Sequence, residues 1–190
     1  MTDRSDWLTG TPRHDAATDR ILTAAAALMA EHGFDAVTVD AVVARAGCSR
    51  ATLYRHLGGR QAILDGVITR AAADVARRVA AAIEGVDGAD RVVEAILTSV
   101  RAIRADPALN AWFAGPRTRS VDDYLATSAH LGALSATLTG LGPADEGALG
   151  VADLGAQWTV RVVLALLTWP LADADAERHL VCRFVAPAFA

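Results

Sequence analysis

Apolar residues recur along the chain at the three- and four-residue spacing of amphipathic helices. In residues 18–32 this pattern is formed by Ile21, Leu22, Ala25, Leu28 and Met29. Similar patterns, bounded by glycine, proline or polar residues, predict further helices at about residues 38–46, 49–57, 60–83, 92–106, 107–115, 121–138, 144–169 and 173–189. Because no segment reads convincingly as a strand, we predict an all-α protein of about nine helices.

The first three predicted helices are sharply bounded. Gly33 ends the first as a residue just past a helix C-terminus does. Thr38 and Ser49 precede the second and third as N-caps, and Gly47 permits a tight turn between them. The predicted organisation is a polar, flexible arm, a three-helix domain with a helix-turn-helix, and a larger helical domain, over residues 1–17, 18–58 and 59–190.

Positive charge is unevenly distributed along the chain. The net charge of the 190 residues is −4, and all 18 positive side chains are arginines. Residues 41–60 contain Arg45, Arg50, Arg55 and Arg60 and no acidic residue, whereas acids outnumber arginines in the rest of the chain after residue 60. A basic patch on an acidic body is typical of a protein that meets nucleic acid with one surface.

Other features argue against other classes of protein. Cys48 and Cys182 are far apart and lack the spacing of a disulfide framework or a zinc site, so we expect a cytoplasmic protein without metal or cofactor. The N-terminal residues are too polar for a signal peptide, and the longest apolar run is too short to cross a membrane. The five histidines are scattered and no HExxH, GxSxG or P-loop motif occurs, so we predict no catalytic residue.

The segment from Thr38 to Arg60 has the form of a helix-turn-helix. Two short capped helices with a glycine between them suit that motif, whose second helix lies in the major groove of DNA. If Leu53 and Leu57 face the core, a rotation of about 100° per residue turns six positions outward or to the flanks: Arg50, Ala51, Thr52, Tyr54, Arg55 and His56. Arginine can pair with guanine through two hydrogen bonds, and the free N–H groups at the helix starts near Thr38 and Ser49 can meet phosphates.

Residues 20–64 closely resemble the DNA-binding domain of the TetR family of transcription regulators. The resemblance rests on the first helix, two turns, one cap and one run of five residues: Gly33-Phe34, Ala46-Gly47, Thr38 and Thr52-Leu53-Tyr54-Arg55-His56. Three positions depart from the family pattern. Leu57 stands where an aromatic residue is usual, Cys48 where valine is common, and Gly58-Gly59 where the turn is stiffer.

The resemblance also implies which residues meet double-stranded operator DNA. Those at the base edges would be Arg50, Ala51, Thr52 and Arg55. Those at the phosphate backbone would be Thr38, Tyr54, His56 and Arg60, the last where the family usually has lysine. A minor-groove contact by Arg4 and Arg13 of the arm is an alternative that nearby acids weaken.

In the TetR family the C-terminal helices hold a small-molecule pocket, and the last two helices pair with a second copy. The candidate pocket residues are Trp112, Phe113, Tyr124, His130, Trp158 and Arg161. The candidate residues of a homodimer interface are Val162, Leu166, Leu180, Val181, Phe184, Val185 and Ala188. Two alternatives stay open: the same apolar residues would suit a monomer core, and a structural ion pair for Arg161 is offered by Asp122, Asp123 and Asp153.

The sequence therefore predicts a dimeric, ligand-responsive repressor that binds a palindromic operator. The effector is of unknown identity, and no membrane partner is expected. An activator, or a regulator controlled by a partner protein, would carry the same DNA-reading segment and is the alternative function. An enzyme that uses the helical body is a remote one.

Overall fold

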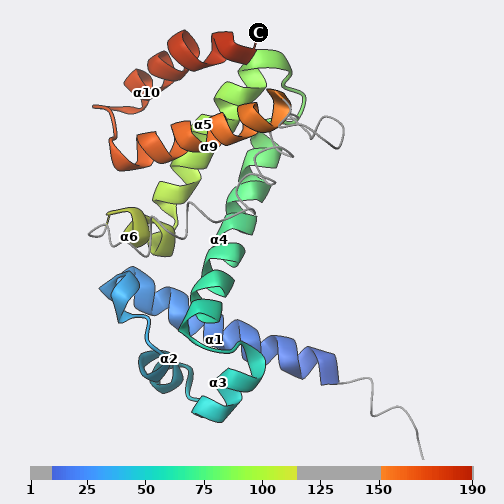
Figure 1. Ribbon diagram of the computed structural model, residues 1–190, viewed down its shortest axis with the longest axis vertical. Helices are drawn as coiled ribbons and strands as arrows, with labels where there is room; N and C mark the ends of the chain where they lie inside the picture. Colours follow the sequence, from blue (N-terminus) through green and yellow to red (C-terminus); the bar gives the residue numbers. More distant parts are fainter. Residues whose placement is uncertain (1–9, 115–150, 190) are drawn as a thin grey trace, which may run out of the picture. The chain divides into compact units, whose positions relative to one another are not determined.

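The computed structural model describes residues 10–114 and 151–189, and every regular element among them is helical (Figure 1). The α-helices are α1 (Gly10–His32), α2 (Val39–Ala46), α3 (Arg50–His56), α4 (Arg60–Ala82), α5 (Gly88–Ala105), α6 (Pro107–Ala114), α9 (Val151–Thr168) and α10 (Ala174–Leu180). Shorter helical turns are η1 (Phe34–Ala36), η2 (Val181–Val185) and η3 (Ala186–Phe189). The predicted all-α class is confirmed, and the helix expected over residues 121–138 lies outside the described residues. None of the described helices is both long and apolar enough to span a membrane.

The described residues form two compact units. Unit 1 contains the chain up to Ala71 together with α6, and unit 2 contains Ala72–Asp106 together with the described residues from Val151 onward. The first half of α4 therefore belongs to unit 1 and the second half to unit 2. Unit 1 extends beyond the three-helix domain expected from the sequence, because α4 and α6 add buried side chains such as Ile63 and Ala108 to its core.

In unit 1, α1, α2 and α3 pack around one apolar core, with α2 and α3 on the same side of α1 (Figure 1). Ile21, Met29, Val42 and Leu53 have no exposed surface. Complete burial of a side chain of this size contributes about 1.5–3 kcal/mol. The inward faces that the apolar spacing predicts for the first three helices are thus confirmed.

α1 begins at Gly10, earlier than the sequence analysis expects. The flexible arm predicted over residues 1–17 is therefore wrong for residues 10–17, where the segment lacks an apolar stripe but is helical. Pro12 lies in the first turn, where its missing N–H breaks no helical hydrogen bond, and Ala16 and Ala17 are strong helix formers. Residues 1–9 lie outside the described part of the chain.

In unit 2, α5 packs against α9 and against the C-terminal turns η2 and η3. α5 supplies Ile96 and Val100 to the core, α9 supplies Val162 and Leu166, and η2 supplies Val181. All five side chains are buried. The strongly amphipathic pattern of α5 explains why this helix lies against both of the others.

An ion pair between a buried carboxylate and a half-buried guanidinium holds α10 within unit 2. Glu177 of α10 is 3% exposed, and its two carboxylate oxygens accept hydrogen bonds of 2.9 and 2.7 Å from Arg104 of α5. Arg104 also donates a 2.9 Å hydrogen bond to the main-chain oxygen of Leu166 in α9. That oxygen cannot receive the usual helical hydrogen bond, because the residue four positions later is Pro170, which has no N–H. One guanidinium therefore joins α5, α9 and α10.

Candidate nucleic-acid interface

Local hydrogen bonds determine where the two helices of the helix-turn-helix begin. The Thr38 Oγ1 accepts a 3.2 Å hydrogen bond from the Ala41 N–H, and the Ser49 Oγ accepts a 3.1 Å hydrogen bond from the Thr52 N–H. Both predicted N-caps are thus confirmed. Gly47 has φ 62° and ψ 40°, the left-handed conformation that glycine adopts most readily. The caps and this turn fix where α3 starts relative to α2.

α3 turns one face into the core of unit 1 and the other toward solvent. Leu53 is fully buried, and Leu57 packs against the same core. Tyr54 is 54% exposed. The exposed residues of α3 are Arg50, Ala51, Tyr54 and Arg55, and Thr52 and His56 are half-buried. The rotation predicted from the sequence is confirmed, so hydrogen-bond donors gather on the outer face, as a reading helix requires.

Acids from outside the basic segment neutralise two of its arginines. Arg45 donates hydrogen bonds of 2.6 Å to both carboxylate oxygens of Glu31 at the end of α1. These bonds lower the pKa of Glu31 and raise the pKa of Arg45. Arg50, the first residue of α3, forms an ion pair with Asp40 in the first turn of α2. These two arginines therefore carry less net positive charge to a phosphate backbone than the sequence suggests.

Arg55 stands apart from the other arginines of residues 41–60. It lies exposed beside Tyr54 on the outer face of α3. Within residues 10–114 and 151–189, no acidic side chain forms an ion pair with it, whereas the other three have such partners. Its guanidinium keeps its full charge and five donors for a ligand. Arg55 is therefore the best-placed residue for a guanine edge.

Arg60, the first residue of α4, is engaged by its own chain. Its Nε donates a 2.7 Å hydrogen bond to the Val37 main-chain oxygen, and its Nη2 donates a 3.1 Å bond to the Phe34 main-chain oxygen. The guanidinium carbon also lies 5.0 Å from the centre of the Phe34 ring, a cation–π contact. These donors fix the turn that leads to the Thr38 cap. The phosphate contact expected for Arg60 stays a prediction.

Two of the predicted pocket residues are packing residues of unit 1. Trp112 and Phe113 belong to α6, and Trp112 is 5% exposed. The Trp112 ring stacks on the Phe34 ring with centroids 6.3 Å apart, and the Phe113 ring lies 5.3 Å from the indole. These contacts give both residues a packing role in unit 1, and the pocket role expected for them stays a prediction. Two further candidates, Tyr124 and His130, lie outside the described residues.

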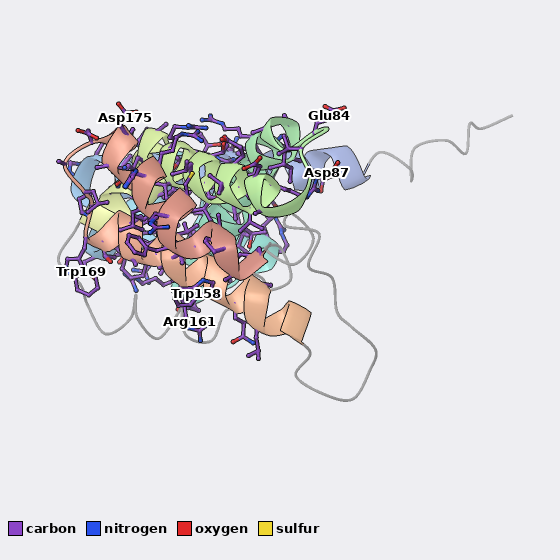
Figure 2. The ribbon with its side chains drawn as sticks, turned by 90° about the horizontal axis from the view of Figure 1, so that it is seen from above. Glu84, Asp87, Trp158, Arg161, Trp169 and Asp175 are labelled. Atoms are coloured by element: carbon purple, nitrogen blue, oxygen red, sulfur yellow. The ribbon has the colours of Figure 1, made fainter. Side chains whose placement is uncertain are left out.

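The last two pocket candidates, Trp158 and Arg161, lie on an exposed stripe that follows α9. Its members recur at three- or four-residue spacing, the period of one helix face: Leu154, Trp158, Arg161, Ala165 and Trp169. Trp158 is 48% exposed and Trp169 is 75% exposed. Figure 2 shows Trp158, Arg161 and Trp169 along the lower edge of the ribbon. Arg161 donates a 3.0 Å hydrogen bond back to the Gln157 main-chain oxygen, so its head lies along the helix surface.

The residues expected at a dimer interface divide into two groups. Four are buried against α5, and their surface is already used within the protomer: Val162, Leu166, Val181 and Val185. These four residues belong to the core of unit 2. Phe184 is 72% exposed, Ala188 is exposed and Leu180 is half-buried. The exposed apolar surface of this region is thus formed by Phe184, Ala188 and the α9 stripe.

Sequence reasoning missed the residues that partner this basic surface. Glu31, Asp35 and Asp40 all precede the acid-free segment, and only folding brings them beside its arginines. A signal was present for Asp40, because an acid in the first turn after an N-cap marks a helix start. Nothing in the sequence around Trp169, which precedes Pro170, indicates that its side chain stays exposed.

The chain has recognisable relatives. Residues 21–67 match the sequence model of a family described as bacterial regulatory proteins, tetR family. Over 185 residues the chain is 34% identical to the uncharacterized HTH-type transcriptional regulator Rv1255c of Mycobacterium tuberculosis (strain ATCC 25618 / H37Rv), which covers 96% of this chain and 90% of the relative. This similarity extends beyond the helix-turn-helix through nearly all of both chains.

Two solved structures share the fold. The TetR family repressor AlkX from Dietzia sp. strain DQ12-45-1b, implicated in biodegradation of n-alkanes, matches with a TM-score of 0.63 and 20% identity over 90% of this chain and 93% of that one. The TetR family transcriptional regulator PfmR from Thermus thermophilus matches with a TM-score of 0.52 and 20% identity over 87% of this chain and 95% of that one. At this identity the likeness concerns the fold alone.

Proposed function

Because the chain belongs to the TetR family of transcriptional regulators, we propose that it is a repressor that binds a palindromic operator as a homodimer. The family and fold are those of DNA-binding regulators rather than enzymes. A protein that reads bacterial DNA works in the cytoplasm, where that DNA lies. A small molecule that favours one arrangement of the protein would release the operator by its differential affinity. Within residues 10–114 and 151–189, the geometry assigns no residue to such an effector.

One observation carries the DNA-binding part of the proposal. The α3 helix buries Leu53 and presents Tyr54 and Arg55 to solvent, and no acid of the described residues pairs with that arginine. A recognition helix in the major groove needs one face that packs against its own domain and an opposite face that carries hydrogen-bond donors. We propose that Arg55 pairs with a guanine in each half of the operator, that Tyr54 contacts a phosphate, and that Thr38 does the same at the start of α2.

The Arg55→Ala variant is expected to lose about thirtyfold or more in operator affinity, because the homodimer loses one bidentate base contact in each half-site. Its affinity for unrelated duplex DNA should fall much less. Fluorescence anisotropy with DNA from upstream of its own gene measures both. Arg77→Ala, which removes the same charge from an exposed position of unit 2, is the matched control. Equal operator binding by the Arg55 variant and the wild type would show that α3 does not read bases.

The exposed apolar stripe supports the dimer proposal. Trp158 on α9, Trp169 just after the end of α9 and Phe184 on η2 leave large aromatic surfaces exposed in one protomer. Exposed aromatic residues at helical spacing are enriched where proteins associate. We propose that a second copy covers these residues, and that the pairing spaces the two α3 helices for half-sites about 34 Å apart.

The Trp158→Asp variant should weaken self-association by about thirtyfold or more, because it removes a central aromatic residue and places a charge in the contact. Sedimentation across a range of protomer concentrations measures the change. Ala80→Asp, at an exposed position of α4 in unit 2, introduces the same charge outside the stripe and should leave association unchanged. A dimer that survives Trp158→Asp with wild-type affinity would place the interface elsewhere.

A further inference from the structure

The ion pair between Asp40 and Arg50 bridges the two helices of the helix-turn-helix. Asp40 lies in the first turn of α2, and Arg50 is the first residue of α3. Their side chains are 68% and 65% exposed. An exposed ion pair is screened by water and contributes little to stability. Its position on the DNA-reading motif therefore points to a role other than holding the fold.

We propose that Asp40 determines specificity, by holding Arg50 ready for a base edge while weakening its attraction to phosphates. The proposal rests on the proposed DNA-binding function and goes beyond it, because it gives a role to an acidic residue that acts through Arg50. The pair uses one terminal nitrogen of the guanidinium, Nη2, and leaves donors on Nη1 and Nε. Arg50 can therefore meet a guanine while it remains bound to Asp40.

The Asp40–Arg50 ion pair should change the affinity for operator DNA and the affinity for unrelated DNA by different amounts. Unrelated DNA is bound almost entirely through phosphate charge. A neutral Asp40–Arg50 pair attracts phosphate less than a free guanidinium does, and the carboxylate repels it. On the operator, the fixed side chain loses less rotamer freedom when it meets its base, which offsets the weaker charge attraction. The ratio of the two affinities is therefore larger with the pair than without it.

The contrast with Arg45 supports a role for the pair in reading DNA. Arg45 has both ends of its guanidinium occupied by Glu31, so that pair serves to join α1 to α2. Asp40 engages Arg50 through one oxygen and one nitrogen, at the N-terminal end of the proposed reading helix. Residues at this end of a recognition helix are the ones that approach base edges.

The Asp40→Asn variant tests the proposal in a titration of operator and unrelated DNA at several salt concentrations. We expect affinity for unrelated DNA to rise about three- to tenfold, with the slope of log affinity against log salt steeper by about two, because the dimer carries the substitution in both protomers. Operator affinity should change by less than that, so the ratio of the two affinities falls. In an Arg50→Ala background, Asp40→Asn should leave the ratio unchanged, because there is no guanidinium to hold.

Asp65→Asn is the matched control. It removes the same charge from α4, where Asp65 accepts a hydrogen bond from Gln61, and should leave the ratio unchanged. If the wild type prefers its operator and Asp40→Asn keeps the same ratio, whether both affinities rise together or neither moves, the proposal is overturned. If the wild type itself shows no preference for its operator, the proposed function fails instead.

Discussion

The Arg104→Met variant is expected to lose about 3–5 kcal/mol of stability, the usual cost of leaving one buried partner of an ion pair uncompensated. The side chain of Glu177 is 4% exposed and both of its oxygens accept hydrogen bonds from Arg104. The substitution also leaves the Leu166 main-chain oxygen without a hydrogen bond, because Pro170 has no N–H to donate. Urea denaturation at one fixed protomer concentration measures the loss.

Two further variants distinguish the loss of the Arg104–Glu177 ion pair from a general effect of removing an arginine. Arg101→Met, on an exposed position of the same helix, should stay within about 0.5 kcal/mol of the wild type. In the double variant Arg104→Met with Glu177→Met, apolar contact replaces the pair, and most of the lost stability should return. A loss of less than about 1 kcal/mol for Arg104→Met, or a double variant no more stable than the single one, would contradict the buried-pair account.

The Trp112→Ala variant is expected to lose about 3–5 kcal/mol through the cavity left by the indole. Trp112 is 5% exposed and stacks on Phe34, whose ring also lies against the Arg60 guanidinium. The cavity should therefore loosen the turn before Thr38. Hydrogen exchange should show faster opening of α1 and α2, and urea denaturation should give the total loss.

Asn110→Ala, on an exposed position of α6, controls for changes in the helix itself and should be nearly neutral. Trp112→Phe should lose less than Trp112→Ala, because it keeps an aromatic ring against Phe34. If Trp112→Ala left the stability and the exchange of α1 and α2 unchanged, α6 would have no packing role in unit 1.

The apolar spacing and the caps predict unit 1 well because their causes are local. Once Leu53 is placed in the core, the rotation of α3 and its other inward positions follow. Thr38 and Ser49 mark the starts of their helices, because each side chain accepts a hydrogen bond from the N–H three positions later. The exposed face of α3 follows from the same rotation. These features need no knowledge of distant parts of the chain.

The partners of the arginines could not be predicted in the same way. Glu31 and Asp40 reach Arg45 and Arg50 only after α1, α2 and α3 pack together. An acid-free segment in the sequence is therefore not an uncompensated surface in the fold. Because Arg55 has no ion-pair partner among the described residues, we propose that it contributes more to DNA binding than the other three arginines of residues 41–60, a distinction that the sequence does not contain.

The sequence also does not determine which aromatic residues are buried within the protomer. Trp112 and Trp158 are similar in the sequence, each within an apolar helix, yet one is buried in unit 1 and the other is exposed on α9. Their apolar character predicts burial against something, but only the fold decides which residue is covered within the protomer. The exposed one is then available to a second copy.

We propose that α3 reads base edges through Arg55. The most direct measurement is the selection of binding sites from a library of random duplexes, with the wild type and Arg55→Ala in parallel. The wild type should enrich two inverted half-sites, and the variant should lose its preference for guanine at one position in each half. Enrichment of no sequence by the wild type, or an identical preference at every position in both proteins, would contradict the account.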